Sequence, residues 1–151
     1  MKSDIVVGDN RLQIARIFDA PRHLVFAFWK DADRIGRWWG CKETTKVDCQ
    51  MDFRAGGAFT YVMQITGAGE FSYKGQYDEI VEPEKIAYHA DIGGTVTHVM
   101  VEFFDLGSQT RMVLTQTGFP APEIFKVVSQ GTTEAFDKLE ALVSNEALVN
   151  R

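Results

Sequence analysis

The three histidines are the first candidates for metal-binding chemistry. His23, His89 and His98 form no tight spacing with a cysteine or an acidic residue. If Gly93-Gly94 is a two-residue hairpin turn, His89 lies directly opposite His98, on the outer face of a sheet. We interpret these two histidines as an exposed surface pair; a weak metal site shared with a neighbouring chain is the alternative. We therefore predict no metal site.

The two cysteines and the other polar groups carry no recognisable catalytic motif. The chain contains no GxSxG segment, and Cys41 and Cys49 lack the CxxC spacing of a redox or metal site. Two cysteines are too few for a disulfide scaffold, so we expect both thiols to be reduced, as in a cytoplasmic protein. Nothing in the spacing brings two carboxylates together for acid–base catalysis. We predict no catalytic residue and no cofactor, and we favour a protein that is not an enzyme.

Composition bounds the class of protein. With 151 residues, of which 45% are hydrophobic and 25% charged, the chain fits one globular domain. We place this domain at residues 1–151, with residues 1–10 as an N-terminal tail. The formal net charge of −5 argues against nucleic-acid binding, which normally needs a basic surface. No apolar run approaches the roughly 20 residues that span a bilayer, so we expect no membrane partner.

The elements that must position these groups follow from the hydrophobic periodicity. Alternating apolar and polar residues predict about seven strands, and the short turns between them favour an antiparallel meander with one buried face. Two short helices follow the first strand, the second running into Trp38-Trp39. From Pro122 to about Ala147, apolar residues at steps of three or four predict a long amphipathic helix. The fold class is α+β.

Two residues around the end of the first strand need separate interpretations. Arg16 shares the register of the apolar Leu12 and Ile14. A solvated strand end is one explanation, and a charge lining a polar pocket is the other. Asp19 is expected to cap the first short helix, with Pro21 in its first turn.

The expected inner face of the sheet is rich in aromatic and thioether side chains. One helix covers only part of a curved sheet, so these side chains either fill the remaining space or line a cavity that admits a ligand. Several buried tyrosines on one face suit an apolar pocket with a few polar groups. The candidate ligand-binding residues are Trp38, Trp39, Met51, Phe53, Phe59, Tyr61, Met63, Phe71, Tyr73, Tyr77, Tyr88, Val101, Phe125, Val128, Thr132 and Phe136.

The adjacent Trp38 and Trp39 cannot both point inward from the end of a short helix. We expect one of the two indoles to pack into the core, while the other forms a lip of the pocket or a partner surface. Structural packing and ligand contact both stay open for this pair.

Several short segments occur along the chain in an order and spacing that resemble a known family. They are Phe18-Asp19-Ala20-Pro21-Arg22, Trp38-Trp39-Gly40, Asp52-Phe53-Arg54-Ala55-Gly56-Gly57, Gly75-Gln76-Tyr77, Glu82-Pro83-Glu84-Lys85-Ile86, Gly118-Phe119-Pro120 and Gly131-Thr132-Thr133-Glu134-Ala135-Phe136-Asp137-Lys138-Leu139. This order resembles the SRPBCC superfamily, and within it the family named after the C-terminal domain of the Hsp90 ATPase activator. The resemblance implies a helix-grip fold like that of START and birch-pollen-allergen domains. In that fold, a curved antiparallel sheet grips a long C-terminal helix around a pocket.

The chain departs from the family pattern at two residues. Cys41 stands where the family usually has proline, and Thr132 stands where it usually has tryptophan after the helical Gly131. We expect the smaller Thr132 to enlarge the pocket. The full co-chaperone also carries a separate N-terminal domain for which this chain has no room, which argues against direct ATPase activation.

These observations favour non-catalytic binding of a small hydrophobic or aromatic molecule between the sheet and the C-terminal helix. The resemblance supports one alternative, a chaperone-associated interaction module in a stress response. The other is a polyketide cyclase- or dehydratase-like enzyme that uses Tyr61, Tyr77 or Arg16 as an acid or electrostatic stabiliser. The residues determine neither the ligand nor the oligomeric state, and a homodimer is left open.

Overall fold

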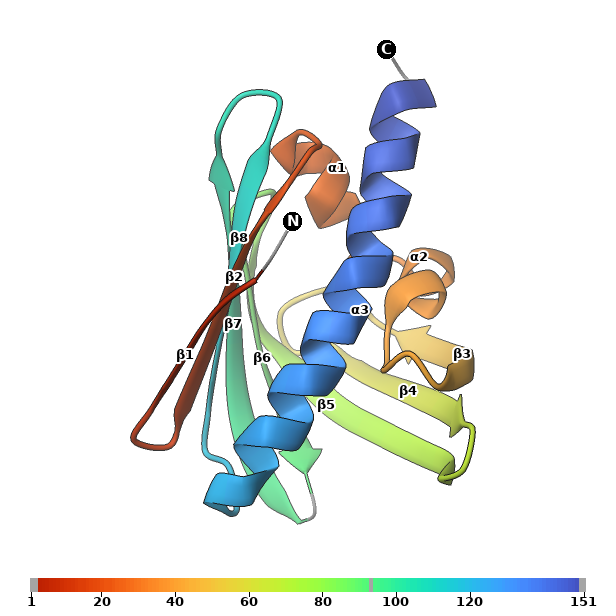
Figure 1. The fold of residues 1–151 in the computed structure, drawn as a ribbon, viewed down its shortest axis with the longest axis vertical. Coiled ribbons are helices and arrows are strands. Elements are labelled where there is room, and N and C mark those ends of the chain that lie inside the picture. The colour runs from red at the N-terminus through yellow and green to blue at the C-terminus, as the bar shows by residue number, and fades with distance from the viewer. Residues whose placement is uncertain (1–2, 93, 150–151) are drawn as a thin grey trace.

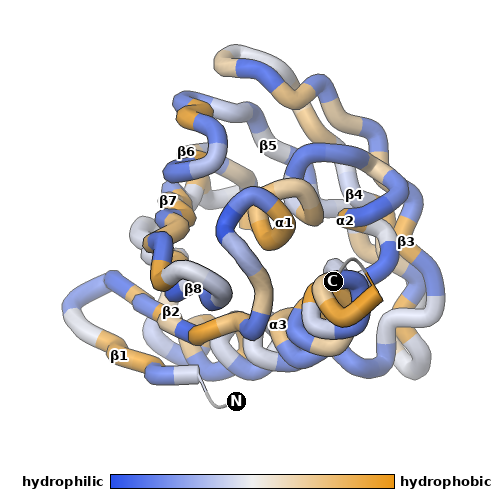
Figure 2. Tube along the Cα trace, turned by 90° about the horizontal axis from the view of Figure 1, so that it is seen from above, coloured by the Kyte–Doolittle hydropathy of each residue, from blue (hydrophilic) through white to orange (hydrophobic). Residues whose placement is uncertain are grey.

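The computed structural model describes residues 3–92 and 94–149, and its architecture is an α+β helix-grip fold (Figure 1). One antiparallel sheet curves around two short helices, and a long C-terminal helix closes its open side (Figure 2). The elements in chain order are β1 Asp4–Gly8, β2 Arg11–Phe18, α1 Arg22–Ala27, α2 Ala32–Trp38, β3 Thr44–Met51, β4 Ala58–Ile65, β5 Gly69–Val81, β6 Lys85–Ile92, β7 Thr95–Asp105, β8 Thr110–Thr117 and α3 Pro122–Val149.

The sheet has eight strands in the order β1-β2-β8-β7-β6-β5-β4-β3, so the prediction of about seven strands is short by one. The extra strand, β1, lies in the segment expected to be a tail, and it pairs with β2 from Asp4 opposite Ala15 to Gly8 opposite Arg11. Its central Ile5, Val6 and Val7 show no alternation and are all exposed. Hydrophobic periodicity could not reveal β1, because the strand has no buried face. Backbone hydrogen bonds to β2 hold it in the sheet instead.

The two short helices begin differently from one another. The side chain of Asp31 accepts a hydrogen bond from the backbone N–H of Arg34 and caps α2. Pro21 is the N-cap of α1, and no side chain caps that helix. The expectation that Asp19 would cap α1 is therefore wrong: the helix starts three residues later, directly after the proline.

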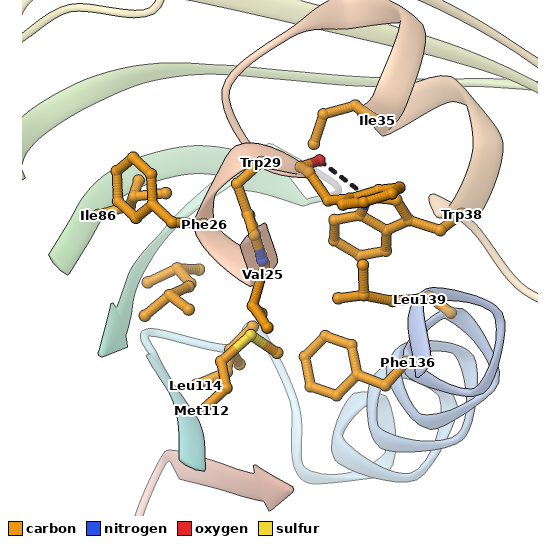
Figure 3. Packing of buried hydrophobic residues seen from close by; sticks show 14 of the residues in the cluster. Val25, Phe26, Trp29, Ile35, Trp38, Ile86, Met112, Leu114, Phe136 and Leu139 are labelled. Carbon is orange, nitrogen blue, oxygen red and sulfur yellow. Dashed lines mark hydrogen bonds between the residues drawn. The ribbon is translucent and has the colours of Figure 1, made fainter. Parts of the chain in front are cut away.

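Helix α3 packs against the core mainly through its second half. Ala135, Phe136, Leu139 and Val143 are buried along one stripe, whereas no residue from Pro122 to Glu134 is fully buried. Phe136 meets Trp38 of α2, with ring centroids 6.3 Å apart (Figure 3). The first half of the helix is thus less tightly held against the sheet.

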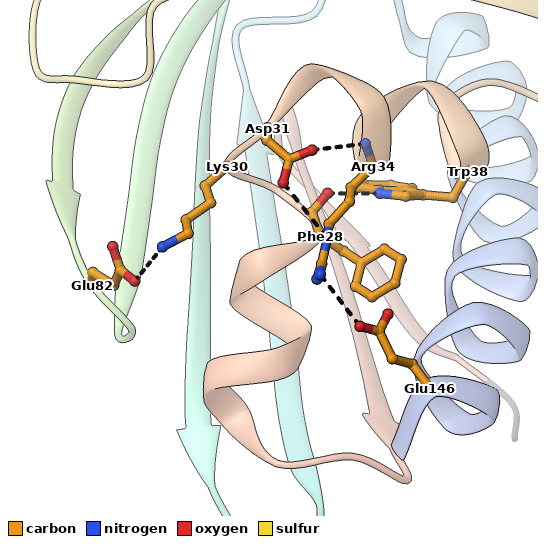
Figure 4. Close-up of polar contacts among 7 residues, drawn as sticks. All are labelled: Phe28, Lys30, Asp31, Arg34, Trp38, Glu82 and Glu146. Atoms are coloured by element: carbon orange, nitrogen blue, oxygen red, sulfur yellow. Dashed lines mark hydrogen bonds and ion pairs between the residues drawn. The ribbon is translucent and has the colours of Figure 1, made fainter. Parts of the chain in front are cut away.

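Charged side chains tie the short helices to α3 and to the sheet (Figure 4). Arg34 of α2 pairs with Glu146 of α3 at 3.3 Å, and its guanidinium lies 4.8 Å from the centre of the Phe28 ring. Lys30 pairs with Glu82 in the β5–β6 turn at 2.9 Å. These links fix the position of the α1–α2 unit, which carries the tryptophans.

The predicted histidine pair has the expected register. His89 of β6 lies opposite His98 of β7, with ring centroids 6.0 Å apart. Asp78 contacts His89 Nδ1 at 2.8 Å. The Gly93-Gly94 turn from which this register was derived includes Gly93, which lies outside the described residues. Across residues 3–92 and 94–149, no helix combines the length and the apolar character needed to cross a membrane.

Candidate functional site

The inner face of β4, β5 and β6 carries a continuous aromatic cluster. Tyr61 lies opposite Tyr73, and Tyr77 lies opposite Tyr88, so cross-strand pairing places the four rings together. Phe59 packs between them, with ring centroids 4.8 Å from Tyr61 and 5.2 Å from Tyr88. These are all four tyrosines of the chain, and each is at most 8% exposed. The alternation of β4 and β5 concentrates every phenol at one place.

The first pair of buried hydroxyls belongs to Tyr61 and Tyr77. Their oxygen atoms are 3.3 Å apart, and either hydroxyl can be the donor. Phe53 packs edge-on against Tyr77, with ring centroids 5.1 Å apart. A pair of hydroxyls that satisfy one another can stay in an apolar interior without a charged partner.

A second polar chain runs deeper into the sheet. Tyr73 is hydrogen-bonded to Tyr88 and to Thr97. The Thr97 hydroxyl donates to the carbonyl oxygen of Ala90 at 3.1 Å and accepts from the Gln116 amide at 3.3 Å. The sequence analysis did not identify Thr97 and Gln116. Both have the same parity as the inward-facing apolar residues of their strands, β7 and β8, so alternation would have placed them on the inner face.

Burial keeps this cluster electrically neutral. Desolvation raises the pKa of Tyr73 and of Tyr77 to about 12. Desolvation is also the main reason why the pKa values of Tyr61 and Tyr88 lie well above the ordinary value, and neighbouring tyrosines raise them further. Cys49 lies opposite Tyr61, and burial, followed by the charge of Asp48, raises the pKa of its thiol to about 11. At neutral pH the cluster therefore offers hydroxyl and thiol groups without charge.

The two adjacent tryptophans have different roles. Trp38 is 1% exposed, and its indole N–H donates to the carbonyl of Phe28 at 3.0 Å (Figure 4). Trp39 is only partly buried, and its ring lies over Tyr61 and Tyr73 with centroid distances of 4.8 and 5.6 Å. In the part of the chain that the structure describes, no hydrogen bond holds the Trp39 indole. Trp38 is therefore the indole expected in the core, and the role of Trp39 as a lip of the pocket or a partner surface stays a prediction.

The loop that carries Trp39 is tethered to α3. The ammonium group of Lys138 donates to the carbonyl oxygens of Trp39 and Cys41 at 3.2 and 3.3 Å. Glu134 accepts from the backbone N–H of Lys42 at 3.2 Å. Burial lowers the pKa of Lys138, although Cys41 and Glu134 oppose that shift. Hydrogen bonds therefore hold the backbone of this loop, whereas the indole of Trp39 is held by ring contacts.

Ligand atoms of Cys41, Glu43 and Glu134 lie within 4.8 Å of one another, a grouping that could hold a cation. Glu134 is already engaged by Lys42, and the positive charge of Lys138 acts on both Cys41 and Glu134. A nearby ammonium disfavours a second cation at this place. We therefore interpret the group as part of the tether between the loop and α3.

The structure distributes the predicted site residues over three environments. A buried set faces the core or the aromatic cluster: Trp38, Phe59, Tyr61, Met63, Tyr73, Tyr77, Tyr88, Val101 and Phe136. A half-buried set borders it: Trp39, Met51, Phe53, Phe125, Val128 and Thr132. Phe71 shares the inner register of Met63, its partner on β4, but is 49% exposed.

Two hollows lie elsewhere on the molecule. One, of about 480 Å³, lies between the β1–β2 turn and the start of α3, and Phe125 helps to line it. The other, of about 340 Å³, lies between α2 and the end of α3. Phe125 packs on Phe119, with ring centroids 4.4 Å apart, so its contacts differ from those expected for the inner pocket. Over Tyr61 and Tyr73, the Trp39 indole occupies the space that an open cavity would require.

Arg16 is neither a solvated strand end nor a free charge in a pocket. It is 2% exposed, its Nη1 atom lies 2.8 Å from Asp137 Oδ1 of α3, and its Nε donates to the Ser3 hydroxyl at 2.9 Å. The solvated interpretation of Arg16 is therefore wrong. The residue links β2 to α3.

Comparison with known proteins supports this architecture. A family model described as "Activator of Hsp90 ATPase homolog 1-like protein" matches residues 19–144. The chain is similar to a crystal structure from Chromobacterium violaceum (22% identity, 89% of this chain and 96% of that chain, TM-score 0.79). A solution structure from Arthrobacter aurescens is similar as well (24% identity, 94% and 91%, TM-score 0.80).

A further similar structure is CalU16 from Micromonospora echinospora, with 20% identity, coverage of 98% and 90%, and a TM-score of 0.73. At these identities the three structures establish a shared fold. No curated protein sequence matches the chain.

Proposed function

Because the chain belongs to the family of activator of Hsp90 ATPase homolog 1-like proteins, we propose that it serves as a binding module for a small, uncharged aromatic or apolar molecule. The ligand takes the place of the Trp39 indole on the inner face of the sheet. The observation that carries this proposal is the contrast between the anchored Trp38 and the unanchored, partly exposed Trp39 over Tyr61 and Tyr73.

A side-chain rotation of Trp39 is enough to open the inner face. Its backbone carbonyl is held by Lys138, so the loop stays in place while the indole moves. The surface that the indole leaves consists of two phenol rings that stack well with a planar aromatic group. An aromatic ligand replaces the ring contacts that Trp39 gives up, which keeps the cost of opening small.

The neutrality of the cluster selects the ligand class. A charged ligand group in this apolar interior would need a charged partner, and the vacated surface itself consists of the rings of neutral phenols with raised pKa values. The hydroxyls of Tyr61 and Tyr77 can exchange their mutual hydrogen bond for one to a ligand carbonyl or hydroxyl. Raised pKa values also make the tyrosines weak acids at neutral pH, which supports binding without catalysis.

Trp39→Ala tests the proposal, with uncharged Nile red as the fluorescent probe and native mass spectrometry as a search for co-purified molecules. Removing the indole removes the competitor, so Nile red should bind Trp39→Ala several-fold more tightly than the parent chain. Phe104→Ala, at an aromatic that is 43% exposed, is the matched control and should leave binding unchanged. Equal binding by all three chains, or none by any, contradicts the proposal.

The family match also supports a second candidate, an interaction module for the Hsp90 chaperone. Trp38 is buried and therefore unsuited to contact a chaperone. Phe104 and Leu106, which are 43% and 49% exposed, are better candidates. A pull-down with the middle domain of Hsp90, together with its ATPase rate, tests this function; no capture and an unchanged rate would exclude it.

A further inference from the structure

The two edges of the sheet differ in how they are protected from pairing with another strand. The β3 edge carries charged Lys46 and Asp48, and its register shifts between Thr44 and Lys46. Charges and bulges of this kind discourage pairing between edges. The β1 edge is regular along its ladder with β2, and its centre is Ile5, Val6 and Val7, which are 45%, 61% and 54% exposed. Figure 2 shows β1 at the outer margin of the sheet.

We propose that β1 pairs with β1 of a second copy of this chain, in antiparallel orientation about a two-fold axis at Val6. In an antiparallel pair, the residues whose backbone groups point outward alternate along each strand. Two residues that lie directly opposite one another must therefore both be odd-numbered or both be even-numbered. Among the registers that satisfy this condition, the one that opposes Val6 to Val6 engages all five residues, Asp4–Gly8.

Charge complementarity points to a second copy as the occupant. In this register Asp4 opposes Gly8 of the second copy, and beyond that glycine lies Arg11, the β2 partner of Gly8. A side chain at Gly8 would meet no atom within 4 Å, so the space above it is open. Two strand spacings amount to about 10 Å, a distance that arginine and aspartate side chains span together.

The two-fold axis creates this ion pair twice, and a single chain cannot form it. Within one chain, Asp4 pairs with Ala15, which is four strand residues from Arg11, or roughly 13 Å. The described part of the chain contains no ion pair of Asp4 or Arg11. The pairing thus gives both exposed charges a partner.

The opposite face of the new pair is apolar. Ile5 opposes Val7 of the second copy there, on the face that carries Leu12 and Ile14 of β2. Val7 also borders the hollow of about 480 Å³ beside Phe125. The second copy's Ile5 therefore lies at the edge of this hollow and covers apolar surface that is exposed in a single chain.

Sedimentation equilibrium on the full chain tests the proposal, and we expect a dimer in the micromolar range. Val6→Lys puts two ammonium groups against each other at the axis and should weaken the dimer at least roughly tenfold. Leu148→Lys, at a residue that is 64% exposed at the far end of α3, should leave it unchanged. Circular dichroism checks that both variants are folded.

A charge exchange provides the second arm. Asp4→Arg and Arg11→Asp alone each leave like charges facing one another and should weaken the dimer roughly three- to tenfold. The double variant restores opposite charges and should recover most of the parent affinity. A chain that stays monomeric up to the hundred-micromolar range overturns the proposal. So does a dimer insensitive to Val6→Lys, or a double variant no better than the single ones.

Discussion

Tyr61 and Tyr77 hold their hydroxyl oxygens 3.3 Å apart in a part of the core where both residues are 3% exposed. Each hydroxyl is the other's side-chain hydrogen-bond partner, because the strands around them supply apolar and aromatic neighbours. The pair belongs to the same surface that Trp39 covers. The strength of the Tyr61–Tyr77 hydrogen bond therefore affects both the stability of the fold and ligand binding.

The stability costs of removing the two hydroxyls should not be additive. Tyr61→Phe leaves the Tyr77 hydroxyl buried without its partner, and Tyr77→Phe does the reverse, so each should lower the free energy of unfolding by about 1–2 kcal/mol. The double variant should cost clearly less than the sum. Urea unfolding followed by circular dichroism measures all four chains. Strictly additive effects would show that the two hydroxyls do not interact.

The stability of the fold should fall between pH 10 and pH 12. The pKa values of Tyr73 and Tyr77 are about 12 in the folded chain, against an ordinary value of 10.0, so unfolding releases their protons above pH 10. Their contribution is fully present below pH 10 and is lost as the pH rises to about 12. The slope is at most about 1.4 kcal/mol per pH unit for each tyrosine.

Tyrosinate absorbance near the top of that pH range provides a direct check. All four tyrosines of the chain lie in the cluster, so no exposed phenol obscures the signal. Ionisation should coincide with loss of the folded circular dichroism signal. A tyrosinate signal that develops around pH 10 while the chain remains folded would contradict the assigned burial.

Asp137→Asn should destabilise the protein through Arg16. The guanidinium of Arg16 is buried, and Asp137 is its nearest carboxylate, at 2.8 Å; Glu140 lies 4.0 Å away. Because Asp137 is largely exposed and Glu140 remains, we expect a loss of about 1–2 kcal/mol, less than for a fully buried pair. Glu84→Gln, at an exposed residue of the β5–β6 turn, is the control. Equal unfolding free energies for the two variants would show that the Arg16–Asp137 ion pair does not stabilise the fold.

Thr132→Trp should close the ligand site with little loss of stability. Thr132 is half-buried and lies one helical turn from both Val128 and the buried Phe136, so an indole there extends over the inner face. Nile red binding should weaken several-fold. Val127→Trp, at a residue of the same helix that is 69% exposed, is the matched control. Unchanged binding by Thr132→Trp would show that the residue does not border the site.

Local patterning was sufficient to predict most of the fold. The period of two between Thr45 and Leu114 predicted the strands and their inward residues, and the period of three to four after Pro122 predicted α3. The register that opposes His89 to His98 also followed from turn length alone. Strand β1 was missed because Ile5, Val6 and Val7 bury no face within one chain. The start of α1 was misplaced because Pro21, not a polar side chain, occupies its N-cap.

The sequence alone also determined which side chains line the inner face, because alternation fixes the side of the sheet to which each residue points. Only the tertiary structure decided what fills the space in front of them. The indole of Trp39 reaches Tyr61 and Tyr73 from a loop far along the chain, and Arg16 of β2 meets Asp137 of α3. Such contacts depend on how helices and sheet pack in three dimensions, and no periodicity within one element encodes them.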